Sequence, residues 1–212
     1  SQLLSTVCNQ IYAESPKIRN ELIVRRSLSS AAAAARRNLV QAMLEHAKEP
    51  MLGIEGYPPE RSMYESVLAA TGLYRVQENG ESGFAAPTRS PKHNLLPCWK
   101  HLTDLIFNRQ PEPLPLTALF GELAQPPYGV LEGLQPVLLC AFMLVHPDET
   151  TLYREGTFLP QPSIADFELL MRRPEMFAIA GSRVEGARAA VVERLAKSLK
   201  VKPATVPVVR AL

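Results

Sequence analysis

Apolar residues along the chain recur mostly at helical spacing, in short segments that prolines interrupt. The clearest segment is 29–48, where apolar residues return every three or four positions, Ser29 or Ser30 can cap the first turn, and Pro50 ends the pattern. Similar spacing predicts further helices over residues 3–13, 18–24, 58–70, 95–107, 117–124, 132–146, 164–171 and 184–199. The pattern therefore predicts a mainly α protein.

Short strands are predicted at two places, each after a group of helices. Asn79 and Gly80 suit the turn between strands at 73–76 and 83–86, and a second hairpin is expected over 151–158. Three helices followed by a hairpin are typical of a winged helix, and this order occurs twice, although the residues themselves do not repeat. We therefore expect a mainly α fold with short β-hairpins. It would consist of two tandem winged-helix-like modules, residues 1–90 and 91–162, and a C-terminal helical segment, 163–212.

Composition narrows the class of protein and its compartment. The 46% of hydrophobic and 21% of charged residues are ordinary for a folded domain, and 19 prolines among 212 residues exclude a long coiled coil. Cys8, Cys98 and Cys140 lie far apart, which favours reduced thiols and a cytoplasmic location. The longest apolar run, 137–145, is too short to span a membrane. A start without Met and an apolar end predict a piece of a longer protein; a complete protein that has lost its initiator is the alternative.

Nucleotide-binding and catalytic motifs are absent from the sequence. Gly181 and Gly186 have the spacing of a P-loop, but Ala187 and Arg188 follow where Lys and then Ser or Thr are needed. The GxSxG, HExxH and GxGxxG patterns do not occur. We therefore expect no enzyme and no cofactor.

The histidines do not complete a site that the sequence can identify. His93, Cys98 and His101 supply three soft ligands where a structural zinc site needs four, so no metal is expected. A hydrolase assembled from distant residues remains an alternative, and a pocket that gathers His46, His93 or His101 with carboxylates would favour it.

Positive charge is unevenly distributed, although the 23 Lys and Arg residues exceed the 21 Asp and Glu residues by only two. Residues 1–50 carry a net charge of +3, residues 51–100 none, residues 101–150 −5 and residues 151–212 +4. The predicted third helix of the second module, 132–146, is apolar around most of its circumference and is therefore expected to be buried rather than to contact DNA.

The first module is the better candidate for nucleic-acid binding. Arg36 and Arg37 are adjacent on a helix, so they cannot both face one groove, and scattered arginines often form only a solvated surface. The candidate nucleic-acid-binding residues are Arg25, Arg26, Arg36, Arg37, Arg61, Arg75, Arg89 and Lys92.

Four stretches carry a resemblance to a known group of proteins: residues 16–22, the alanine run after Ser29 and Ser30 with Arg36, residues 52–58, and residues 126–129. Together they resemble a non-catalytic region of large bacterial P-loop ATPases of anti-phage defence systems, the BREX type among them. The resemblance covers most of the chain. It implies a multi-domain ATPase whose nucleotide site lies outside these residues, and an adaptor role for this region.

These observations predict a non-enzymatic interaction region of a larger bacterial ATPase, which binds double-stranded DNA through the basic first module. The alternative is a protein–protein interaction scaffold without nucleic-acid binding, whose acidic second module docks to the rest of the ATPase chain or to a partner subunit. Neither role involves a membrane. Salt-dependent affinity for DNA separates the two.

Overall fold

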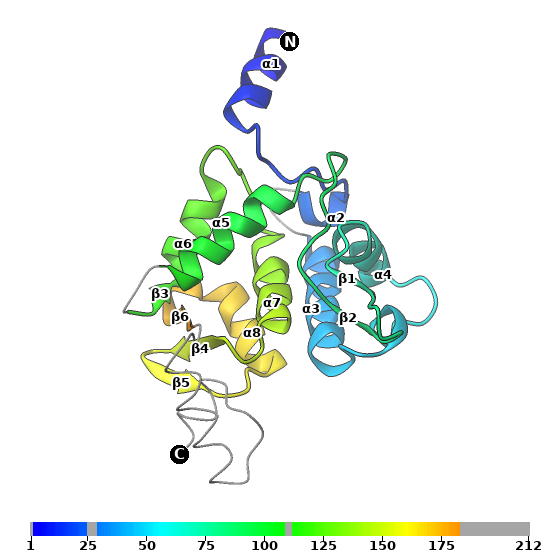
Figure 1. Ribbon diagram of the computed structural model, residues 1–212, viewed down its shortest axis with the longest axis vertical. Coiled ribbons are helices and arrows are strands. Elements are labelled where there is room, and N and C mark those ends of the chain that lie inside the picture. The colour runs from blue at the N-terminus through cyan, green and yellow to red at the C-terminus, as the bar shows by residue number, and fades with distance from the viewer. Residues whose placement is uncertain (1, 25–28, 109–111, 183–212) are drawn as a thin grey trace.

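The computed structural model describes residues 2–24, 29–108 and 112–182 (Figure 1). This part of the chain contains eight α-helices and two small antiparallel sheets, so the expectation of a mostly helical chain with short β elements is confirmed. No helix in the described ranges is long and apolar enough to cross a membrane. The predicted helix over 184–199 lies outside the described residues.

The first half of the chain builds helices around a two-stranded hairpin. Ser29 caps the longest helix by accepting a hydrogen bond from the Ala32 amide at 3.2 Å, as its position predicts. The proline pair at 58–59 opens a helix that continues through a π-helical turn. The elements are α1 (Gln2–Ile11), α2 (Glu21–Val24), α3 (Ser30–Glu45), the 3-10 turn Pro50–Gly53, α4 (Pro59–Met63), the π-helical turn Tyr64–Ala69, β1 (Tyr74–Val76) and β2 (Ser82–Phe84).

The second half places helices against a four-stranded sheet in the order β3-β6-β4-β5. Glu155 and Gly156 connect β4 to β5 with φ angles of 49° and 77°, the positive pair that a tight hairpin turn requires. The elements are α5 (Leu96–Phe107), β3 (Leu114–Pro115), α6 (Leu116–Ala124), α7 (Gln135–Val145), β4 (Thr150–Arg154), β5 (Thr157–Leu159), α8 (Ile164–Arg172), the 3-10 turn Pro174–Met176 and β6 (Phe177–Gly181).

The two halves share one hydrophobic core. The helix α7 lies in its middle, and every residue from Gln135 to Phe142 is buried, which confirms the expectation for this apolar helix. The helix α3 packs against α4, α7 and α8, and so joins both halves (Figure 1). The domain boundaries at 90/91 and 162/163 stay a prediction, but side chains from all three predicted segments enter the same buried cluster.

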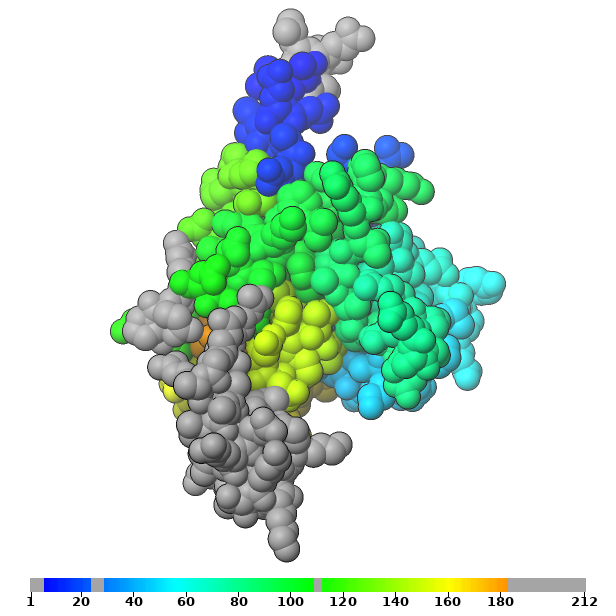
Figure 2. Space-filling view, viewed as in Figure 1, coloured from blue at the N-terminus to red at the C-terminus, as the bar shows by residue number. Residues whose placement is uncertain are grey.

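The helix α1 projects from this body, as Figures 1 and 2 show. Tyr12, just after its end, packs against Gly129, where an added Cβ would lie 2.6 Å from the Tyr12 ring. Val7 and Ile11 are each 46% exposed, so part of the apolar side of α1 has no packing partner among the described residues. From Tyr12 the chain returns to the body through residues 13–20.

Candidate nucleic-acid interface

Two of the residues predicted to contact DNA, Arg36 and Arg37, join α3 to its neighbours. Arg36 is half-buried; its Nη1 donates to the Gly133 carbonyl at 3.5 Å, and its Nε is buried without a hydrogen-bond partner among the described residues. Burial lowers the pKa of the Arg36 guanidinium from its ordinary value, and the nearby Glu132 carboxylate offsets part of this shift. Arg37 forms an ion pair with Glu168 of α8. The two arginines therefore have different structural partners.

Arg61 and Arg75 are also engaged within the fold. The Arg61 Nε donates to Glu65 Oε1 at 2.8 Å, and its guanidinium lies 5.5 Å from the centroid of the Tyr57 ring. Arg75, on β1, donates to the Ala86 carbonyl at 2.9 Å and to the Gly72 carbonyl. Contact with a phosphate would have to compete with these interactions.

Arg89 and Lys92 are different, because both side chains are exposed and neither forms an ion pair with a described residue. They lie in the loop that precedes α5. Arg25 and Arg26 lie outside the described residues. Among the predicted residues that the structure describes, Arg89 and Lys92 are the two that are exposed and have neither an ion pair nor a side-chain hydrogen bond with a described residue, so both are available for an anionic partner.

Three further basic residues, Lys17, Arg19 and Lys100, were missed by the sequence analysis. Residues 17–20 belong to no helix or strand, and Lys17 and Arg19 are exposed while the intervening Ile18 is buried. Lys100 is exposed on the first half of α5. None of the three forms an ion pair with a residue in the described ranges. The single apolar residue Ile18 between Lys17 and Arg19 was the available signal for the first two.

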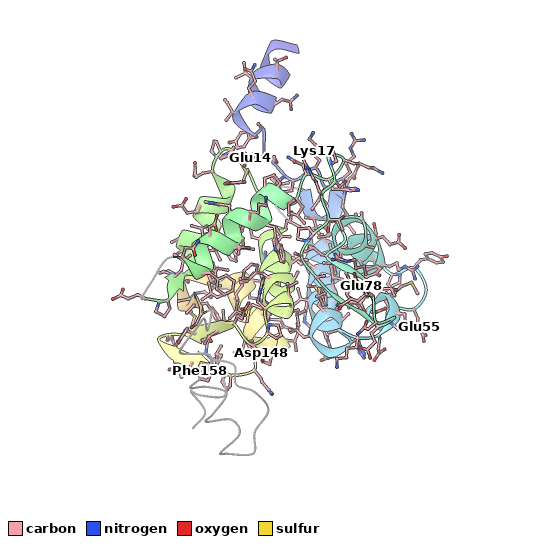
Figure 3. All side chains as sticks on the ribbon, viewed as in Figure 1. Glu14, Lys17, Glu55, Glu78, Asp148 and Phe158 are labelled. Carbon is pink, nitrogen blue, oxygen red and sulfur yellow. The ribbon has the colours of Figure 1, made fainter. Side chains whose placement is uncertain are left out.

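Backbone contacts bring these segments together. The Lys17 amide donates to the His93 carbonyl at 2.7 Å, so Lys17 lies beside the loop that carries Lys92. The Asn94 side-chain amide donates to the carbonyls of Ala13 and Ser15 at 3.3 and 3.2 Å. Figure 3 shows Lys17 at the end of the molecule from which α1 projects. We call the group of Lys17, Arg19, Arg89, Lys92 and Lys100 the basic face.

Carboxylates reduce the positive charge of this region. Glu14 and Asp104 line a groove beside the basic face, and Glu21 begins α2 two residues after Arg19. The five cationic side chains of the basic face outnumber these three carboxylates, so the net charge of the region is positive.

The groove, which we call the Arg89 groove, has a volume of about 750 Å³ and lies between the 89–94 loop and the first turns of α5. Arg89 and Lys100 contribute its cations. The rings of His101 and Tyr128 stack there with their centroids 4.4 Å apart and their planes 15° apart. Burial raises the pKa of the Tyr128 phenol above its ordinary value, and the negative charge of Glu14 adds to this effect.

The Arg89 groove gathers His101 with the carboxylates of Glu14 and Asp104, which is the arrangement that the hydrolase alternative requires. Among the described residues, however, no hydrogen bond joins the His101 ring to either carboxylate or to the Ser90 hydroxyl that also lines the groove. The described residues of the groove therefore show no hydrogen-bonded pair of the kind that a general base forms with its partner.

The histidines and cysteines form no metal site in the described part of the chain, where no three His, Cys, Asp or Glu side chains are placed to hold an ion. Cys98 is buried, and burial raises the pKa of its thiol to about 12.

No protein-family model, curated protein or solved structure matches this chain.

Proposed function

We propose that this chain is a non-enzymatic interaction region that binds DNA through the basic face. The observation that carries the proposal is the group of five exposed Lys and Arg side chains on adjoining segments, none of them in an ion pair with a described residue. Lys and Arg side chains of this kind bind phosphates and release condensed counterions, which supplies sequence-independent affinity for DNA.

The proposed contact is with the phosphate backbone rather than with base edges. The third helix of the second half, α7, is buried, and so cannot enter a major groove. The corresponding helix of the first half exposes Glu65 and places Glu60 at its surface, and these carboxylates would repel phosphates. We therefore expect little sequence preference.

Two further parts of the proposal concern architecture and context. The order of helices and a hairpin in each half supports tandem winged-helix-like modules, although their third helices would not read DNA. The resemblance to the non-catalytic region of BREX-type ATPases supports a place beside a motor domain in a larger bacterial protein. In that position the basic face would act as a DNA adaptor.

A titration by fluorescence anisotropy with a short random duplex, at about 50 and 200 mM salt, tests this function. Each phosphate contact contributes about 0.9 to the slope of log affinity against log salt, so five contacts would weaken binding roughly 500-fold across this fourfold change. The double variant Lys17→Ala with Lys92→Ala should reduce the salt effect to about 40-fold, since about 1.8 is lost from the slope.

The matched control is the double variant Lys48→Ala with Arg172→Ala. Both residues are exposed and neither forms an ion pair within the described ranges, so this variant removes the same charge from elsewhere on the surface. Its slope should stay at the parent value. Equal losses in the two variants would show that only net charge matters, and no binding at low salt by a folded protein would reject the function.

Protein docking is the second candidate, and the exposed apolar side of α1 favours it. Val7, Ile11, Tyr12 and Leu131 are each 40–46% exposed, and a groove of about 800 Å³ lies between the N-terminal segment and the α6–α7 region. Apolar surface of this kind is often an interaction site. If the duplex does not bind, Val7→Asp with Ile11→Asp should abolish assembly with the rest of the ATPase while the body remains folded.

A further inference from the structure

The Arg89 groove combines three chemical features that one nucleotide would use together. Arg89 and Lys100 provide positive charge without an ion pair among the described residues. The stacked rings of His101 and Tyr128 provide an aromatic surface. The remaining polar groups include the carboxylates of Glu14 and Asp104, which can accept hydrogen bonds from the amino and imino groups of a base.

The geometry points to the Arg89 groove as a binding site for an unpaired nucleotide of a nucleic-acid strand. The phosphate would lie at Arg89 and Lys100, and the base would extend the stack formed by His101 and Tyr128. This inference rests on the proposed function, because the basic face would guide the rest of the strand into position. It adds a preference for unpaired bases, which backbone contact alone does not produce.

The size and composition of the groove support this ligand class. Its volume of about 750 Å³ is within the usual range for small-molecule sites, roughly 300–1,000 Å³. Single-stranded nucleic acids are commonly bound by a positive groove with aromatic side chains on which bases stack. A base inside a duplex is stacked on both sides, and so could not use the rings without leaving its helix.

Tyr128 gives the ring surface a fixed position. It is the last residue of the 125–128 turn, in which its amide donates to the Gln125 carbonyl at 3.1 Å, and the adjacent Pro127 carbonyl accepts a hydrogen bond from the Glu14 amide at 3.2 Å. The same turn therefore holds both the ring and the segment that carries Glu14. Its partner His101 comes from the rigid helix α5, so the stacked pair joins two elements distant in sequence.

The test uses a single-stranded oligonucleotide that contains one 2-aminopurine, whose fluorescence falls when it stacks, with the duplex of the same sequence as comparison. The whole chain should quench the single-strand signal and bind the single strand more tightly than the duplex at equal salt. Tyr128→Ala should weaken single-strand binding at least about fivefold, since an aromatic–base stack contributes about that much or more. Tyr128→Phe should retain the affinity because the ring remains.

Tyr57→Ala is the matched aromatic control, since Tyr57 is 92% exposed and lies outside the groove. It should bind like the parent. DNA and RNA strands are run in parallel to identify the source of the nucleotide, and free adenosine monophosphate is added as a competitor. If free adenosine monophosphate displaces the oligonucleotide but the 2-aminopurine fluorescence of the bound oligonucleotide is not quenched, the assignment of the groove to a nucleotide within a strand is overturned.

The outcomes separate this inference from the proposed function. Duplex binding through the basic face, with no quenching and no loss in Tyr128→Ala, would leave the function standing and overturn the nucleotide site. Equal losses of duplex and single-strand affinity in Tyr128→Ala would also overturn it. Failure of both ligands to bind a folded chain would reject the two proposals together.

Discussion

Asn20 should be one of the most sensitive polar residues of this protein, because it holds the segment that carries Lys17 and Arg19. Its side chain is buried, with an exposed fraction of 8%. The Nδ2 group donates to Ser66 Oγ at 2.8 Å and to Ser62 Oγ at 3.3 Å, and Oδ1 accepts the Leu22 amide at 2.9 Å. One side chain therefore caps α2 and joins it to the α4 region.

Asn20→Ala should lower the free energy of unfolding by about 2–3 kcal/mol. Each of the three hydrogen bonds contributes about 1 kcal/mol, and the loss of the cap also leaves the Leu22 amide without its acceptor. With a urea dependence of about 3 kcal/mol per molar, expected for a chain of this length, the denaturation midpoint should fall by roughly 0.7–1 M.

Urea denaturation followed by circular dichroism measures this change. Ser62→Ala is the control: it removes only the longer hydrogen bond, at 3.3 Å, and should cost less than about 1 kcal/mol. A loss below about 0.5 kcal/mol in Asn20→Ala would refute the reasoning, because the segment would then be held without this side chain. At low urea, Asn20→Ala should also bind duplex DNA more weakly than Ser62→Ala.

Two further predictions concern packing and thiol chemistry. Gly181→Ala should destabilise the fold by about 1–3 kcal/mol in the same urea assay, because the added Cβ would lie 2.6 and 2.8 Å from atoms at the end of α5. The control is Gly121→Ala, whose Cβ would have no atom within 4 Å and which should be neutral or slightly stabilising. Equal effects of the two substitutions would contradict the close packing at Gly181. Iodoacetamide at pH 8 should label exposed Cys8 first, because burial raises the pKa of the Cys98 thiol to about 12 and also raises that of Cys140, so both thiols stay protonated. Mass spectrometry should find one rapidly modified cysteine in the native protein and three in urea. Rapid labelling of Cys98 in the native protein would contradict its burial.

The helical part of the fold was predictable because it depends on local patterns. The apolar spacing of 29–48 together with Ser29 is sufficient to specify α3, and a long apolar run is sufficient to specify a buried helix at α7. The hairpin turn at Glu155 and Gly156 was equally visible, because glycine readily adopts the positive φ angle that the turn needs. In each case the determining residues are neighbours in sequence.

The sheet was only partly predictable. The strands β3 and β6 pair with each other across more than sixty residues of sequence, and β6 then pairs with β4. The small residues Ala178, Ala180 and Gly181 weaken the alternating pattern that would identify β6 as a strand. Their place beside β4 depends on the space that α5 leaves, and no local signal contains that information.

The candidate site shows the same limit more sharply. The positions of positive charge are known from the sequence, and Arg89 and Lys92 were in the predicted set. The contacts of Arg36 and Arg37 within the fold, and the place of Lys17 beside the loop of Lys92, arise only when the chain is folded. A charged side chain is available to a partner only where folding leaves it in water and without a counter-ion, and both conditions depend on residues that are distant in sequence.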